Sequence, residues 1–249
     1  MKVTFRFYEE LNDFLSRKYR KVAFEYKIAT NTSVKDAVES LGIPHTEIDL
    51  LLVNSKSVDF TYQLKEGDYV SGYPKFESFD ISTTTKLRPD PLRETKFILD
   101  VHLGKLAKYL RLLGFDTFYN NNLDDPEIIE IAKNEKRIIL TRDLGILKNN
   151  KVTHGYWLRS QNSREQLKEV IQRFDLKSKI NTFTRCSICN GIIFEVEKSK
   201  IIHKLNKGTI ENFDLFYQCN SCGKIYWEGS HYKNINEFIE QIIYTKKAG

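Results

Sequence analysis

The first 73 residues alternate apolar and polar positions in the manner of a small α+β unit. Val3, Phe5 and Phe7 alternate with polar side chains, which indicates a strand with one buried face. Strands are expected at four places: residues 3–7, 22–28, 50–53 and 69–73. Between the second and the third, Ser33 followed by Asp36 three positions later predicts the start of a helix.

The pattern changes after residues 75–94, a segment with Ser, Thr and Pro that suits a linker. Beyond it, strands are expected at 97–99, 115–119, 137–141 and 156–158, and helices around 103–113, 128–132 and 163–174. The last helix is expected to begin with a capping box formed by Ser163 and Gln166. Strands that alternate with helices predict a doubly wound α/β domain with a parallel sheet.

Three aspartates stand where strands of this sheet end. Asp100 follows the first strand, Asp143 follows the third, and Asp125 opens the second helix just after the second strand. The carboxyl ends of parallel strands share one edge of a sheet, and open α/β folds bind ligands at that edge. Carboxylates gathered there can hold Mg²⁺ or Mn²⁺, which prefer oxygen ligands and activate water against a phosphodiester.

Each acid also has a structural interpretation. Asp125 and Asp143 stand where helices begin, and Asp is a favoured N-cap residue. Asp100 has less to gain structurally, because it ends an apolar strand. A phosphoaspartyl phosphatase would carry a second Asp two positions after the first, but His102 occupies that position. The residues alone therefore leave a shared metal site and separate helix caps as alternatives.

Basic residues accompany the acids. Lys105, Lys108 and Arg111 recur every three residues on the helix side opposite its leucines, and Arg142 and Arg159 follow later strands. We expect these five side chains to bind an RNA backbone. A solvated helix face with no ligand is the alternative interpretation of such spacing. The net charge of +6 and the pI of 8.9 modestly favour an anionic partner.

The four cysteines form the most specific motif. Cys186 and Cys189 make one CxxC pair, and Cys219 and Cys222 make a second. Two such pairs in one short segment match tetrahedral zinc coordination by four thiolates, and a ribbon can hold an extra hairpin in the long spacer between them. A thioredoxin-like redox motif is the alternative, but neither pair stands at a strand–helix junction.

The compartment is expected to be the cytoplasm. No apolar run approaches the roughly 18 residues that a membrane crossing needs. The N-terminus lacks the apolar core of a signal peptide. Four cysteines in a reducing compartment favour a metal over disulfides.

Three blocks of residues are recognisable as a set. The first runs from Asp100 through Leu103-Gly104-Lys105-Leu106-Ala107 and Tyr109-Leu110-Arg111 to Gly114-Phe115-Asp116. The second joins Asp125-x-Glu127-Ile128 to Arg137-Ile138-Ile139-Leu140-Thr141-Arg142-Asp143. The third contains both CxxC pairs and Tyr226-Trp227-x-Gly229-Ser230-His231. Together they resemble the Mut7-C ribonuclease family, a branch of the PIN-like nucleases, over residues 96–235.

The resemblance implies a PIN-like, metal-dependent RNase with RNA as its substrate. Asp100, Asp125 and Asp143 would be its catalytic acids and would hold Mg²⁺ or Mn²⁺, while the cysteines would hold a structural zinc. Many PIN nucleases carry a further acid shortly after Thr-x-Asp, but here Leu144 to Leu147 follow. Glu127 and Glu130 are the remaining candidates for helper acids.

The first 75 residues resemble the ubiquitin-like β-grasp domain that often precedes this module. That domain is related to sulfur carriers, whose chains end in Gly-Gly, whereas this segment continues through Gly72-Tyr73-Pro74-Lys75. A sulfur-carrier role is therefore not expected, and docking to a protein partner or positioning of RNA replaces it.

The expected organisation has four parts: a ubiquitin-like β-grasp domain at 1–75, a linker at 76–94, a PIN-like nuclease domain at 95–180, and a zinc ribbon with the C-terminal tail at 181–249. The alternative function is a non-catalytic RNA-binding or adaptor protein, in which the acids serve as helix caps.

Overall fold

The structure is a computed structural model that describes residues 1–74, 95–229, 237 and 240–241. The predicted linker therefore lies outside the described residues. The chain forms two compact units. Unit 1 contains residues 1–100 and 123–159, and unit 2 contains residues 101–122 and 160–249.

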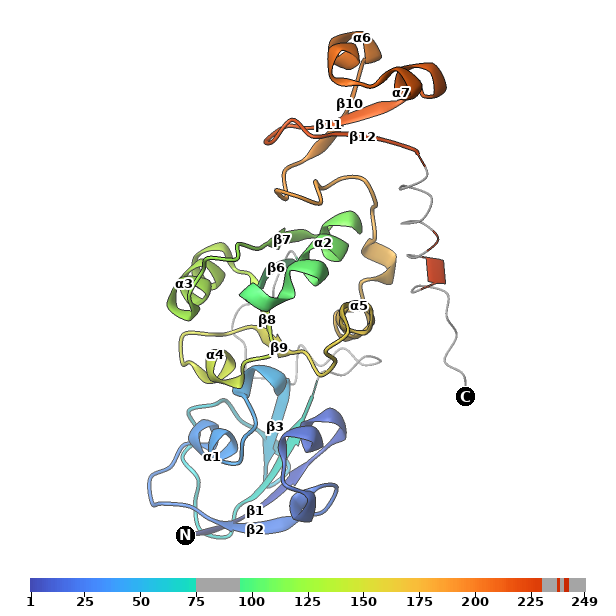
Figure 1. Cartoon of the computed structure of the whole chain (residues 1–249). Coiled ribbons are helices and arrows are strands. Elements are labelled where there is room, and N and C mark those ends of the chain that lie inside the picture. Colours follow the sequence, from blue (N-terminus) through green and yellow to red (C-terminus); the bar gives the residue numbers. More distant parts are fainter. Residues whose placement is uncertain (75–94, 230–236, 238–239, 242–249) are drawn as a thin grey trace. The chain divides into compact units, whose positions relative to one another are not determined.

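Unit 1 begins with a five-stranded mixed sheet, drawn in blue to cyan in Figure 1. Its strands are β1 (Lys2–Phe7), β2 (Phe24–Lys27), β3 (Leu50–Val53), β4 (Lys56–Ser57) and β5 (Tyr69–Tyr73), in the order β2-β1-β5-β3-β4. β1 and β5 run parallel, and the other neighbours run antiparallel. The helical segments are η1 (Glu9–Phe14), η2 (Arg17–Tyr19), α1 (Val34–Ser40) and η3 (His45–Glu47).

The four predicted strands of this sheet form, the second of them shortened, and β4 is an additional strand that the pattern did not predict. Phe5 and Phe7 are buried in one apolar core with residues of α1, and the Ser33 side chain accepts the Asp36 N–H at 3.1 Å. The second strand starts at Phe24, whereas Val22 is 47% exposed. The reason is a turn just before it: Lys21 has a φ of 57°, and its N–H is bound by the Asn12 side chain.

Unit 1 also contains three strands of a second sheet: β6 (Lys96–Leu99), β8 (Ile138–Thr141) and β9 (Gly155–Trp157). β6 and β8 are parallel, and so are β8 and β9, which confirms the predicted parallel sheet. The full sheet has the order β7-β6-β8-β9, with β7 at Asp116–Phe118. Its helices in this unit are α3 (Asp125–Glu135) and α4 (Leu144–Lys148). Every residue of β8 is buried, as expected for a central parallel strand.

Unit 2 combines helices with a three-stranded antiparallel sheet. The helical segments are η4 (Val101–Leu103), α2 (Gly104–Leu112), α5 (Ser163–Arg173), η5 (Lys177–Lys179), α6 (Lys198–Ile201), η6 (Ile202–Lys204) and α7 (Lys207–Asn212). The sheet has the order β10-β11-β12, with β10 at Ile193–Val196, β11 at Phe216–Cys219 and β12 at Ile225–Trp227. Within the described part of the chain, no helix has the length and apolar character that a membrane crossing requires.

The spacer between the cysteine pairs forms the antiparallel strands β10 and β11, with the short helices α6 and α7 between them. Asn206 caps α7 by accepting the Thr209 N–H at 2.8 Å. One expectation about helix α5 is wrong. The N-cap of α5 is Asn162, not Ser163, since the Asn162 side chain accepts the first amides of the helix. The Gln166 side chain donates to the Ser160 carbonyl instead of completing a capping box.

Candidate active site and zinc centre

One buried hydroxyl links two of the three acids. Thr141 ends β8, and its Oγ1 donates to Asp100 Oδ2 at 2.8 Å. The same oxygen accepts the backbone N–H of Asp143 at 2.8 Å. Asp100 directly follows β6, and its own N–H donates to the Leu140 carbonyl. The parallel pairing of β6 with β8 therefore places Asp100 and Asp143 on either side of one side chain, as their positions after strands predicted.

Asp125 joins this pair through its electrostatics. Desolvation and then the charges of Asp143, Asp100 and Asp124 raise the pKa of the Asp125 carboxyl, although the residue is exposed. Such coupling requires that the three acids share one region of unit 1. Their oxygens are not all within 4.8 Å of one another, a spacing that only the four cysteines meet among the described His, Cys, Asp and Glu residues.

The interpretation of the acids as helix N-caps holds for Asp143 but not for Asp125. Helix α3 is capped by Asp124, which exchanges hydrogen bonds with Glu127 in a complete capping box. Asp125 is thus not the cap, and the Glu127 carboxylate is engaged in the box. Asp143, in contrast, does cap α4, because its Oδ1 accepts the Gly145 N–H at 2.6 Å. The cap uses one oxygen of the Asp143 carboxylate.

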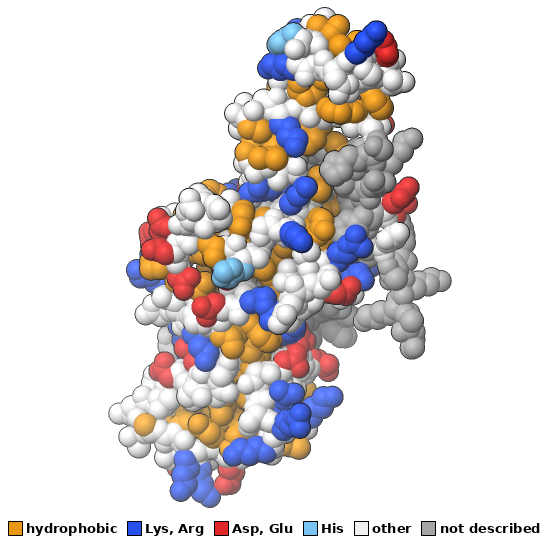
Figure 2. Space-filling view, in the orientation of Figure 1, with side chains coloured by type: hydrophobic (Ala, Val, Ile, Leu, Met, Phe, Trp, Pro, Cys, Tyr) orange, Lys and Arg blue, Asp and Glu red, His pale blue; other side chains and the backbone are white. Residues whose placement is uncertain are grey.

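A polar trough lies in unit 2. One cavity of about 470 Å³ is lined by residues of η4 and α2, by Tyr119, and by Gln161, Asn162, Ser163 and Gln166. An adjoining cavity of about 350 Å³ shares three of these lining residues and adds Lys108, Tyr109 and Arg164. Lysine and arginine side chains gather over α2 and α5 on the face that Figure 2 shows. The trough therefore offers cationic groups beside polar hydrogen-bonding side chains.

Arg111 does not belong to this basic face. Lys105 and Lys108 are exposed, but Arg111 is only 5% exposed. Its guanidinium donates to the carbonyls of Thr117 and Ile188 at 2.9 and 2.7 Å. The expectation that Arg111 lies on the solvated side of the helix is wrong. Strand β7 and the first CxxC loop cover its side chain, and the spacing of the basic residues does not reveal these contacts.

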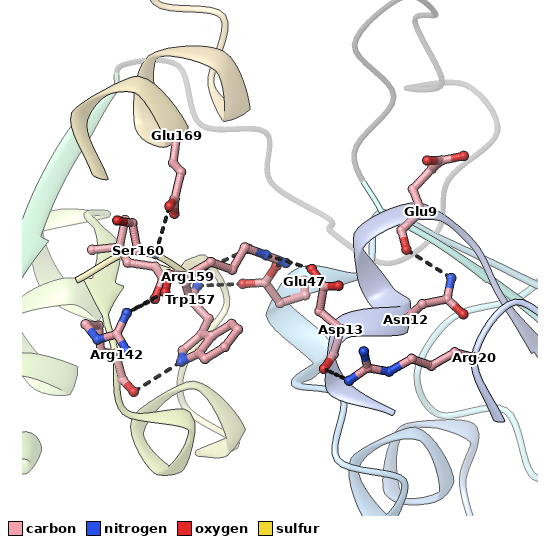
Figure 3. Close-up of polar contacts among 11 residues, drawn as sticks. Glu9, Asn12, Asp13, Arg20, Glu47, Arg142, Trp157, Arg159, Ser160 and Glu169 are labelled. Atoms are coloured by element: carbon pink, nitrogen blue, oxygen red, sulfur yellow. Dashed lines mark hydrogen bonds and ion pairs between the residues drawn. The ribbon is translucent and has the colours of Figure 1, made fainter. Parts of the chain in front are cut away.

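Arg142 and Arg159 are likewise engaged by the protein (Figure 3). The Arg142 guanidinium donates to the carbonyls of Leu158 and Arg159 at 2.9 and 2.7 Å. The Arg159 guanidinium donates to the Trp157 carbonyl and lies 3.4 Å from a carboxylate oxygen of Glu47. Both side chains hold strand β9 in place, a role that their positions in the sequence do not reveal.

The four cysteines converge as the motif predicts. Their sulfurs all lie within 4.8 Å of one another, with 3.6 Å between Cys186 and Cys222 and 3.4 Å between Cys189 and Cys219. Tetrahedral zinc with Zn–S bonds of about 2.3 Å needs sulfurs about 3.8 Å apart. The donor set and its spacing therefore fit zinc.

The environment of Cys186 also favours a thiolate. Burial alone raises the pKa of this thiol, but hydrogen bonds from the Tyr226 hydroxyl and from neighbouring amides lower it to about 6. The Tyr226 hydroxyl lies 3.0 Å from Cys186 Sγ. Four adjacent thiolates repel one another, and a divalent cation would balance that charge.

The first CxxC loop is fastened to strand β7 and helix α2. Asn190 donates to Asp116 Oδ1 at 2.8 Å and accepts the Thr117 N–H at 3.0 Å. Arg185 forms an ion pair with the other oxygen of Asp116, and Arg111 reaches the Ile188 carbonyl inside the loop. A metal bound at the cysteines would thus order a loop that packs against the helix carrying Lys105.

Two family models match the chain. The Mut7-C RNAse domain matches residues 95–239, and the Mut7-C ubiquitin domain matches residues 1–80. The chain belongs to the Mut7-C RNAse family. This family membership indicates a nuclease, preceded by a ubiquitin-like domain. No curated protein and no solved structure matches the chain.

The raised pKa of Asp125 gives this Mut7-C protein a testable pH dependence. In the unfolded chain the carboxyl has its ordinary pKa of 3.8, so the native state binds the proton more tightly. The penalty of the charged form is complete above the raised pKa and vanishes as the pH falls below 3.8. Asp125→Asn should therefore melt at a higher temperature than the wild type at pH 7 without added divalent metal. The gain should shrink as the pH is lowered.

The measurement is thermal unfolding of both proteins between pH 7 and pH 4. Added Mn²⁺ should then raise the melting temperature of the wild type more than that of the variant. A variant that melts earlier at pH 7 would show that the carboxylate supports the fold.

The zinc centre gives a second prediction. Purified protein should contain about one zinc per chain by metal analysis, as a closed four-cysteine site requires. Cys219→Ser should lose it and should speed amide exchange at Thr117, whose N–H depends on the Asn190 side chain. The parallel sheet should stay folded. Folded protein without zinc, or a disulfide between Cys186 and Cys219, would contradict this.

Proposed function

We propose that this protein is a metal-dependent ribonuclease that hydrolyses RNA phosphodiester bonds. Asp100, Asp125 and Asp143 would hold Mg²⁺ or Mn²⁺ in a PIN-like domain spanning about residues 95–180. A bound cation of this kind supplies activation of water and stabilisation of the leaving oxygen. The family match supports the nuclease, and the acids of unit 1 support the metal dependence.

The observation that carries the proposal is the arrangement around Thr141. Its hydroxyl donates to Asp100 and accepts from the Asp143 backbone, so both acids are fixed to the end of one strand. Asp125 senses both charges although Asp124 already caps its helix. Helix capping alone gives no reason to maintain this mutual repulsion, whereas a cation turns it into attraction.

The chain's own residues would then divide the work. Thr141 holds the acid pair in register, and Asp125 completes the oxygen donors. Lys105 and Lys108 would bind phosphates of the RNA in the trough of unit 2, together with Arg164. The zinc ribbon would support RNA binding by holding helix α2 through Arg111 and Asp116.

An adaptor that binds RNA without cleaving it is the second candidate. The observation in its favour is the cap that Asp143 provides to helix α4, because a carboxylate with a structural task can persist without catalysis. The two functions differ in what happens when that carboxylate becomes an amide.

Asp143→Asn separates them. Asn still accepts the Gly145 N–H as an N-cap but removes a negative charge that the cation needs. Stability without divalent metal should change little or rise, because repulsion among the acids falls. Cleavage of labelled RNA in Mn²⁺ or Mg²⁺ should fall by orders of magnitude, since metal activation of water is the proposed catalytic device.

The matched control is Asp124→Asn, which exchanges a neighbouring acid for another good N-cap residue and should keep most of the cleavage activity. Wild-type protein that cleaves neither RNA with either metal, combined with an Asp143→Asn variant that melts much earlier, would establish the adaptor instead.

RNA binding gives a further prediction. Lys105→Ala with Lys108→Ala should weaken binding of single-stranded RNA and lower the salt slope by up to about 1.4, since each lost phosphate contact removes about 0.7. Lys177→Ala with Lys179→Ala removes the same charge from exposed positions outside the trough. Binding measured over a range of salt concentrations should change little for this control. Equal slopes for both pairs would return the lysines to a solvated face.

A further inference from the structure

Glu47 is the most deeply buried carboxylate among the described residues. It ends η3 of the N-terminal ubiquitin-like domain, and its side chain has no exposed area. Its Oε1 accepts the backbone N–H of Trp157 on β9 at 2.6 Å, and its Oε2 lies 3.4 Å from Arg159 (Figure 3). A buried carboxylate is costly unless it is paired in this way, so the contact is a specific one.

Arg159 forms an ion pair with the Glu47 carboxylate. Burial lowers the pKa of its guanidinium, but the charge of Glu47 and other neighbours outweighs burial, so the pKa is raised overall. The guanidinium also lies 3.4 Å from Asp13 and over the rings of Phe14 and Trp157. The ubiquitin-like domain therefore holds strand β9 through an ion pair that is largely buried and flanked by aromatic rings.

Further contacts connect strand β9 to the acid loop, the turn at residues 141–148 that carries Asp143. The Trp157 indole N–H donates to the Arg142 carbonyl at 3.1 Å, and the Arg142 guanidinium donates back to two carbonyls that follow Trp157. Arg142 directly precedes Asp143. One continuous series of contacts thus runs from Glu47 through Trp157 to Arg142, the residue before Asp143, and all of it lies within unit 1.

We propose that the ubiquitin-like domain is a built-in positioning element of the nuclease. Glu47 fixes β9, and Trp157 fixes the Arg142 carbonyl, so that the turn carrying Asp143 stays rigid. The catalytic consequence rests on the proposed function, whereas the mechanical one does not. This assigns an intramolecular task to a domain whose relatives include detached carriers.

A second contact between the same domain and strand-flanking residues supplies a matched control. Both ring nitrogens of His45 face acceptors: Glu39 Oε1 at 2.6 Å and the Val152 carbonyl at 2.7 Å. Glu39→Gln weakens this contact, which does not lead to Arg142. This variant should lower the melting temperature without changing hydrogen exchange in the acid loop.

The test variants are Glu47→Gln and Trp157→Phe, the second of which keeps the backbone N–H and an aromatic ring but removes the indole donor. Hydrogen exchange, measured without metal, should become faster over residues 141–148 in both variants and stay unchanged in Glu39→Gln. The amides of Asp143 and Gly145 report directly, because each is bound inside this turn.

Mn²⁺ titration is the second readout. Both variants should bind Mn²⁺ roughly tenfold more weakly, as expected when a group that orients a metal ligand is lost, and kcat should fall while KM for RNA stays unchanged. Unchanged exchange over 141–148 in both variants would overturn the positioning proposal. Faster exchange in a protein whose wild type binds no Mn²⁺ would uphold positioning and overturn the proposed metal site instead.

Discussion

Repulsion among carboxylates at the end of one parallel strand pair is the constraint on which the described site depends. Asp100 and Asp143 are held against the same hydroxyl, and Asp125 carries a raised pKa because it senses both. A fold gains nothing from gathering like charges, so the arrangement has to be secured by other contacts. Thr141 secures it from within the strand, and the α4 cap secures it from the helix side.

Arginine side chains supply several of the other contacts that hold the chain segments together. Three of them stand at positions for which the sequence predicted RNA binding, yet each guanidinium donates to backbone carbonyls. A guanidinium has five donors in a fixed plane and stays charged when buried, which suits it for fastening chain segments together. Arg111 fastens the zinc loop to α2, and Arg159 fastens strand β9 to the ubiquitin-like domain. We propose that the exposed lysines Lys105 and Lys108 bind the phosphates instead.

A metal in unit 2 and protein contacts in unit 1 would play comparable parts. In unit 2 the cysteine loop reaches β7 through Asn190 and Asp116, so zinc would order a surface that the helix α2 rests on. In unit 1 the ubiquitin-like domain performs the corresponding task through Glu47 without any metal. In each unit, a small element with its own buried core contacts a strand of the parallel sheet. The strand is β7 in unit 2 and β9 in unit 1.

The sequence by itself determined the elements that follow from local periodicity and from spacing. Strands β1, β3, β5, β6, β8 and β9, the start of α1 at Ser33, the parallel sheet and the four-cysteine cluster were all predictable, because each depends on near neighbours or on a fixed ligand spacing. Only the tertiary structure decided which polar side chains are buried and what they face. The burial of Arg111, the cap at Asn162 in place of Ser163, the hydroxyl of Thr141 between two acids and the reach of Glu47 to Trp157 are examples. Glu47 and Trp157 are separated by 110 positions, and no local pattern encodes a hydrogen bond across such a distance, because it exists only where the folded chain brings the two segments together.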